Sequence, residues 1–152
     1  MGLVAKIRSS LSPRTRLLDE FAVIAGRCES LAASLKRHAA MCDAPKIKHG
    51  LAELAAAEVA HANALREILL EHRRWPSMPQ TPARDGSSNW ERANADLTLQ
   101  SELMRDLIAQ LARWQGIEPA LAARLRELAA VESQSLAKLR DLALRCDTYA
   151  ID

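Results

Sequence analysis

Apolar residues recur along most of this chain at alternating steps of four and three positions, the spacing that places side chains on one face of an α-helix. Four such runs are present, separated by two short breaks and one longer polar segment. The apolar face of each helix must be buried against its neighbours. The pattern therefore predicts an all-α protein, a bundle of four packed helices.

The ends of the predicted helices follow from capping residues and prolines. Ser12-Pro13 is typical of a helix start, because serine caps the first turn and proline is tolerated at its first position. Trp75-Pro76 ends the second helix, because the residue before a proline avoids the α region. The bundle is predicted as a single domain of residues 12–148. Its predicted helices cover residues 13–42, 45–74, 89–115 and 118–147.

The lengths of the connections predict how the helices are arranged. The breaks after residue 42 and at residues 116–118 are short, so each joins two antiparallel neighbours. Residues 75–88 contain prolines, serines and a glycine, and they are numerous enough to run the length of a bundle. We therefore expect two antiparallel helix pairs joined by a long crossover.

The second and fourth helices repeat one another. When residues 43–61 are aligned with residues 117–135 without a gap, seven of the nineteen positions are identical. Glu58 aligns with Glu132, and both glutamates occupy positions that the apolar spacing assigns to the core. His61 follows Glu58 by three residues, and Ser135 follows Glu132 by three. Buried carboxylates and imidazoles are unfavourable unless they are paired or bind a metal, so these positions are candidates for a site.

Helix lengths indicate that the polar groups meet at one level of the bundle. Glu58 and Glu132 each lie about fifteen residues beyond a short break, and a rise of about 1.5 Å per residue then gives the level on the preceding helix. On the first helix that level is Ala25 to Cys28, and on the third helix it is residues 99–101. We expect a polar layer there, inside an otherwise apolar bundle.

The segments LAELAAAEVAHANAL and ELAAVESQSLAKL resemble the second and fourth helices of the ferritin-like superfamily, and of its rubrerythrin-like branch most closely. The resemblance covers roughly residues 17–146. It implies a two-iron site with a glutamate on each of the first and third helices and Glu-x-x-His on each of the second and fourth.

This chain matches that ligand pattern only in part. Glu58 and His61 correspond to the second helix, and Glu132 to the glutamate of the fourth, but Ser135 replaces the histidine. The remaining two glutamates fall near Ala25 and near Ser101, with Glu102 as a substitute if the third helix is rotated. A pair of iron ions needs several carboxylates, so we expect a degenerate di-iron site and the loss of oxidase or peroxidase chemistry.

Two interpretations of the remaining groups stay open. Glu58, His61 and Glu132 could bind one ion of iron, zinc or manganese, with Cys28 or water completing the coordination. Alternatively they form a metal-free network, in which His61 is protonated or one glutamate keeps its proton because like charges share the site.

Composition and charge limit the possible partners. The net charge of +2 is too small to indicate nucleic-acid binding, and no apolar run reaches the length needed to cross a bilayer. Residues 1–11 are predicted to be a flexible basic N-terminus, where weak contact with a membrane surface is conceivable. The odd number of cysteines, three, favours reduced thiols and a cytoplasmic location. We expect Cys42 and Cys146 at opposite ends of the bundle, beyond the reach of a disulfide.

These observations favour a non-catalytic function. The leading hypothesis is a ferritin-like scaffold, interaction or regulatory bundle that forms a homodimer or binds a protein partner. The alternative is a metal-binding protein or oxidoreductase that uses Glu58, His61 and Glu132.

Overall fold

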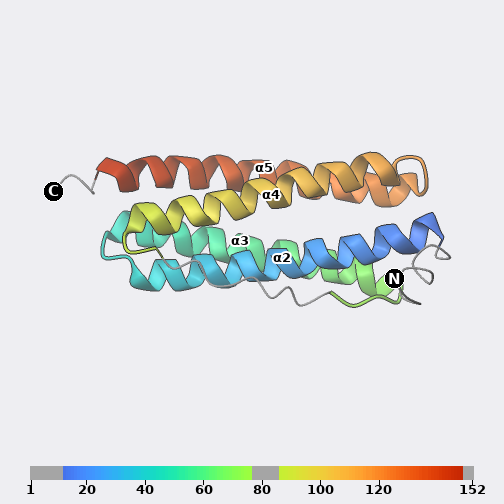
Figure 1. Ribbon diagram of the computed structural model, residues 1–152, viewed down its shortest axis with the longest axis horizontal. Helices are drawn as coiled ribbons and strands as arrows, with labels where there is room; N and C mark the ends of the chain where they lie inside the picture. Colours follow the sequence, from blue (N-terminus) through green and yellow to red (C-terminus); the bar gives the residue numbers. More distant parts are fainter. Residues whose placement is uncertain (1–11, 77–85, 149–152) are drawn as a thin grey trace, which may run out of the picture.

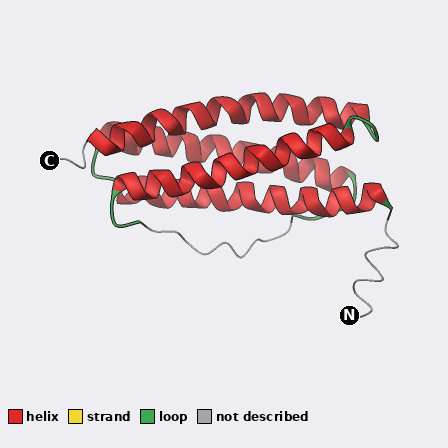
Figure 2. Cartoon of the chain, turned by 45° about the horizontal axis from the view of Figure 1, so that its top comes forward, coloured by secondary structure: helices red, strands yellow, loops and turns green. Residues whose placement is uncertain are grey.

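The computed structural model describes residues 12–76 and 86–148, and it shows four α-helices packed side by side (Figures 1 and 2). The predicted helical bundle is confirmed, and the described residues contain no strand. The predicted basic start and most of the predicted crossover lie outside the described residues. The helices are α2 (Pro13–Met41), α3 (Pro45–Glu71), α4 (Asn89–Trp114) and α5 (Pro119–Thr148).

Each helix packs against two neighbours that run in the opposite direction. α2 contacts α3 and α4, and α5 contacts the same two helices. α3 ends at one end of the bundle and α4 begins at the other (Figure 1). As a result α2 and α5 lie diagonally opposite and run in the same direction. The four helices thus enclose one central core, to which each contributes one face.

Serine caps set the first turns of α2 and α4. The Ser12 hydroxyl oxygen accepts a hydrogen bond from the Thr15 amide at 3.2 Å, as the Ser12-Pro13 pair predicted. The Ser88 hydroxyl oxygen accepts one from the Glu91 amide at 3.1 Å, and the Glu91 carboxylate accepts one in turn from the Ser87 amide. These contacts satisfy backbone donors that have no partner within the helix.

α3 ends three residues earlier than predicted. Its chain leaves the helix through Arg73, which has a φ of 55°. The Arg73 amide donates to Leu70 O at 2.9 Å and the Arg74 amide to Leu69 O at 2.8 Å. This pair of bonds is the Schellman motif, in which a left-handed residue closes the helix. A glycine usually takes that position, so the sequence signal for the helix end was missing.

The core contains the residues that the apolar spacing selected on α2 and α3. On α2 and directly after it, the predicted core positions are Leu17, Phe21, Ile24, Cys28, Leu31, Leu35, His38 and Cys42. On α3 they are Ile47, Leu51, Leu54, Glu58, His61, Leu65 and Ile68. All of them are buried.

On α4 the apolar spacing predicts an inward face of Leu97, Gln100, Met104, Leu107, Leu111 and Trp114. The register differs from this prediction, because Leu97, Met104 and Leu111 are only partly buried. The face of α4 that points inward is instead Ala93, Asp96, Gln100, Leu103, Leu107, Gln110 and Trp114.

Cys42 and Cys146 lie at the same end of the bundle, so the prediction that they occupy opposite ends was wrong. α2 and α5 run in the same direction, and both end there (Figure 1). Both side chains are buried, and all three cysteines are free thiols. Burial and the nearby Cys42 raise the pKa of Cys146 to about 11.

The outer faces of the helices carry charged residues that link neighbouring helices. Arg124 of α5 lies 2.6 Å from the Glu71 carboxylate of α3. Both side chains are about half exposed, so solvent and salt screen the attraction between them. Within residues 12–76 and 86–148, no helix combines the length and the apolar character needed to cross a membrane.

Candidate functional site

All four helices contribute a side chain to one buried polar layer at the middle of the bundle. α3 supplies Glu58 and His61, which share a face because they are three residues apart. α5 supplies Glu132, α4 supplies Gln100, and α2 supplies Cys28. The predicted meeting of these groups at one level is confirmed by their contacts with one another.

Glu58, His61 and Glu132 form a compact cluster of possible metal ligands. One ligand atom from each lies within 4.8 Å of the others. His61 Nδ1 is 2.8 Å from Glu132 Oε2 and 3.6 Å from Glu58 Oε1. Glu58 is completely buried, while Glu132 is 2% and His61 8% exposed. Groups of this kind lose their hydration on folding, so the protein must compensate their charges internally.

The nitrogen at the centre of this cluster has no hydrogen-bond partner among the described residues. The distance from His61 Nδ1 to Glu132 Oε2 is that of a hydrogen bond, but the ring nitrogen is not aimed at the oxygen. The contact is therefore an ion pair by distance alone. A buried nitrogen without a partner is unfavourable, and a metal ion would satisfy it.

Gln100 occupies the place on α4 that the ligand pattern assigned to Ser101. Its side-chain amide donates to Glu58 Oε1 at 3.1 Å and to Glu132 Oε1 at 3.0 Å. Ser101 instead donates to the backbone oxygen of Leu97, and Glu102 is exposed, so the proposed additional ligand Glu102 is outside the site. Successive side chains on a helix point about 100° apart, so Gln100 and Ser101 cannot both face the site.

Cys28 lies in the layer as predicted, but as a hydrogen-bond donor. Its Sγ is 3.3 Å from Glu58 Oε2. Burial, together with the charges of Glu58 and Glu132, raises the pKa of the Cys28 thiol. A thiol binds metals only as the thiolate, so Cys28 is poorly suited to be a ligand here. Ala25, one turn earlier on α2, is completely buried and offers no donor atom.

The protonation of the site follows from its burial and its like charges. Burial raises the pKa of Glu58 and the Glu132 carboxylate adds to this effect, while His61 and Cys28 oppose it. The nearby Glu132 and Glu58 carboxylates raise the pKa of His61 to about 9. In the absence of metal at neutral pH, His61 is therefore charged and Glu58 holds a proton more tightly than a free glutamate does.

The cavity beside these groups is very small. It has a volume of about 10 Å³ and reaches Cys28, His61 and Glu132 on its polar side. The rest of its lining is apolar. This volume is close to the minimum that holds one water molecule, so it is matched to a single small ion or water and not to an organic substrate.

A second buried polar cluster lies one turn along α4, and sequence reasoning missed its central residue. The Asp96 carboxylate accepts a hydrogen bond from Ser34 Oγ at 2.6 Å and pairs with His38 Nδ1 at 2.6 Å. Asp96 is completely buried and His38 is 1% exposed. Burial raises the pKa of Asp96, although the bonds from Ser34 and His38 oppose the shift. The position of Asp96, four residues before Gln100, is the signal that could have found it.

Fold and site together define a four-helix bundle with a buried Glu–His–Glu cluster that could hold a metal ion. Neither the protein-family models nor the curated proteins compared with this chain give a match.

Proposed function

We propose that this protein binds one divalent transition-metal ion, of zinc, iron or manganese, through Glu58, His61 and Glu132. The observation that carries the proposal is the buried His61 Nδ1, which lacks a hydrogen-bond partner while two carboxylates lie within 3.6 Å of it. Two carboxylates and one imidazole are a common ligand set for these ions.

The charges of the site support this proposal. Two ionised glutamates with a neutral imidazole carry a charge of −2, which a divalent ion neutralises inside the low-dielectric core. Without the ion, protons on His61 and Glu58 must take its place, as the raised pKa values of both groups indicate. The Gln100 amide contacts the Oε1 atoms of both glutamates, which leaves Oε2 of Glu132 beside the imidazole. It thereby orients the two carboxylates as ligands.

A single ion suits the site better than a pair. Two iron ions need carboxylates at the positions that Ala25 and Gln100 occupy here, and a second histidine at Ser135. Ser135 is buried but lines a groove between α3 and α5, together with Gly50 and Leu54. The cavity of about 10 Å³ also leaves no room for a substrate. We therefore propose a non-catalytic role for the metal, structural or regulatory, in a degenerate ferritin-like bundle.

Metal analysis tests this function directly. The protein is purified without added metal or chelator and its zinc, iron and manganese content is measured, with equilibrium dialysis against each ion afterwards. We expect close to one ion per chain, and its loss in Glu58→Ala. Glu53→Ala is the matched control, because Glu53 is an exposed glutamate on the same helix. Protein that stays folded, contains no metal and takes up none of the three ions would overturn the proposal.

The second candidate is a metal-free scaffold that acts through a protein partner or as a homodimer. It is favoured by the hydrogen bonds that Gln100 and Cys28 give to the glutamates, which stabilise the carboxylates without a metal. Trp75, which is 75% exposed beside the end of α3, offers an apolar contact for such a partner. Light scattering separates the monomer from the dimer, and Trp75→Ser should weaken a dimer formed through this residue.

A further inference from the structure

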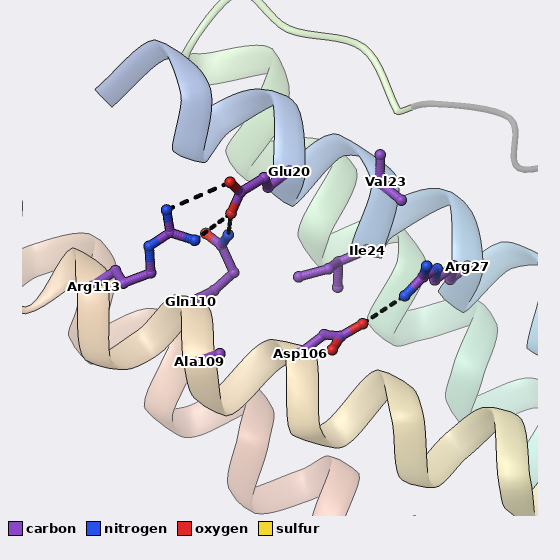
Figure 3. Close-up of a pocket in the computed structure, with 8 residues that line it drawn as sticks. All are labelled: Glu20, Val23, Ile24, Arg27, Asp106, Ala109, Gln110 and Arg113. Atoms are coloured by element: carbon purple, nitrogen blue, oxygen red, sulfur yellow. Dashed lines mark hydrogen bonds and ion pairs between the residues drawn. The ribbon is translucent and has the colours of Figure 1, made fainter. Parts of the chain in front are cut away.

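A surface groove lies between α2 and α4 (Figure 3), and its lining on α4 begins at Asp106, six residues beyond Gln100. Its volume is about 320 Å³. Val23 and Ile24 of α2 and Ala109 of α4 form its apolar lining. The groove therefore brings water to within one layer of side chains of the core.

Two ion pairs cross this groove, one on each side of Ile24 (Figure 3). Arg27 of α2 pairs with the Asp106 carboxylate of α4 at 2.5 Å. Arg113 of α4 pairs with Glu20 of α2, and both side chains are about half exposed. These pairs hold the two helices together at the rim, and salt weakens exposed pairs of this kind.

Ile24 is shared between the groove and the interior. It lines the groove, and it also lines the small cavity that reaches Cys28, His61 and Glu132. Its side chain is 4% exposed and points into the space between α2 and α4 (Figure 3). The groove between α3 and α5, with a volume of about 170 Å³, has no lining residue in common with that cavity.

We propose that a divalent metal ion reaches the buried cluster through the α2–α4 groove, and that the Ile24 side chain closes this route. The inference rests on the proposed function. Ile24 lines both the groove and the cavity, so a change of its rotamer, with slight separation of α2 and α4, opens the path.

Kinetics of metal uptake test the route independently of affinity. The probe is Co²⁺, whose visible absorption reports its coordination, added to the metal-free protein in a stopped-flow instrument. We expect Ile24→Ala to accelerate uptake at least tenfold, which corresponds to about 1.4 kcal/mol in the barrier. Ile24→Val should accelerate uptake less than Ile24→Ala does. The valine variant replaces the alanine variant in the test if the alanine variant does not fold. Ile24→Phe should slow uptake, and the affinity at equilibrium should change little in all three.

The matched control is Leu35→Ala, which removes a completely buried apolar side chain from the same helix, away from the groove. Equal acceleration in Leu35→Ala and Ile24→Ala would show that uptake follows general loosening of the bundle, and it would overturn the route. An unchanged rate of Co²⁺ uptake in the Ile24 variants that fold would also overturn the route. In either case Co²⁺ binding at equilibrium would leave the proposed function intact. Absence of Co²⁺ binding by the unaltered protein would overturn the proposed function, and the route with it.

Discussion

His61 Nδ1 of α3 lies 2.8 Å from Glu132 Oε2 of α5, inside the bundle and without the alignment of a hydrogen bond. The contact joins the two repeated halves of the chain, since His61 follows Glu58 by three residues and Glu132 is the equivalent of Glu58 in the other half. These two groups and Glu58 together could hold a metal ion. The predictions below separate the metal-bound from the metal-free form of this contact.

Gln100→Ala should weaken metal binding without removing a ligand. The Gln100 amide holds both glutamates in place, and losing such an orienting group typically lowers metal affinity about 10–100-fold. Equilibrium dialysis with Zn²⁺ measures the change. Gln110→Ala is the control, because Gln110 is a buried glutamine of the same helix that contacts Trp114 and Glu20 instead. Equal affinity of the two variants would contradict the orienting role of Gln100.

The stability of the metal-free protein should fall as pH rises from neutral to alkaline. The folded pKa of His61 is raised from 6.5 to about 9, so its contribution is fully present below pH 6.5 and is lost as pH passes through about 9. The raised pKa of Glu58 acts in the same direction, and its contribution is fully present below about pH 4.5. The shift in the pKa of His61 corresponds to a change of at most roughly 3 kcal/mol in the free energy of unfolding.

Urea unfolding with a chelator present, at pH 6 and pH 9.5, measures this loss of stability. His61→Leu should flatten the pH dependence over the same interval. Stability that rises between these two pH values would show that the imidazole is not charged in the folded protein.

Replacing both glutamates should leave the metal-free protein equally stable or make it more stable. Glu58→Leu with Glu132→Leu removes the buried carboxylates together, and exchanging a buried ionic group for apolar packing is often neutral or favourable by about 1–4 kcal/mol. Glu132→Leu alone should destabilise the protein, because it leaves a charged His61 without its closest partner. Melting temperatures recorded with chelator compare the variants. A double variant that melts below the unaltered protein would argue that the site is normally filled.

Asp96→Ala should destabilise the bundle strongly and leave the affinity for metal unchanged. The substitution removes one partner of the buried His38 and the acceptor of Ser34, and breaking a buried pair in this way costs about 3–5 kcal/mol. Urea unfolding gives the stability and Zn²⁺ dialysis gives the affinity. A large loss of metal affinity in folded Asp96→Ala would mean that this cluster and the Glu–His–Glu cluster act as one site.

Arg73→Gly should stabilise the protein, by up to about 1 kcal/mol, at the end of α3. A non-glycine residue at a φ of 55° is strained by roughly that amount, and glycine adopts the conformation freely. Urea unfolding measures the gain. Arg126→Gly is the control, because Arg126 is an exposed arginine in the interior of α5, where glycine should destabilise by about 1 kcal/mol. Equal effects of the two substitutions would contradict the assigned role of Arg73.

The sequence by itself determined the helices and the main groups of the site. The four-and-three spacing on α2 and α3 selected residues that are all buried, because an isolated apolar face has no stable position except the core. The repeat aligned Glu58 with Glu132, and the short breaks placed Ala25 to Cys28 and residues 99–101 at the level of these glutamates.

Only the tertiary structure decided which face of α4 points inward and which helices end at the same end of the bundle. The inward face of α4 contains Asp96, Gln100 and Gln110, and polar residues do not stand out as core in a hydropathy pattern. Their burial is possible because other helices supply partners, such as Ser34 and His38 for Asp96. Likewise, Cys42 and Cys146 share one end because α2 and α5 run in the same direction. Such relations depend on contacts between distant segments, which local spacing cannot specify.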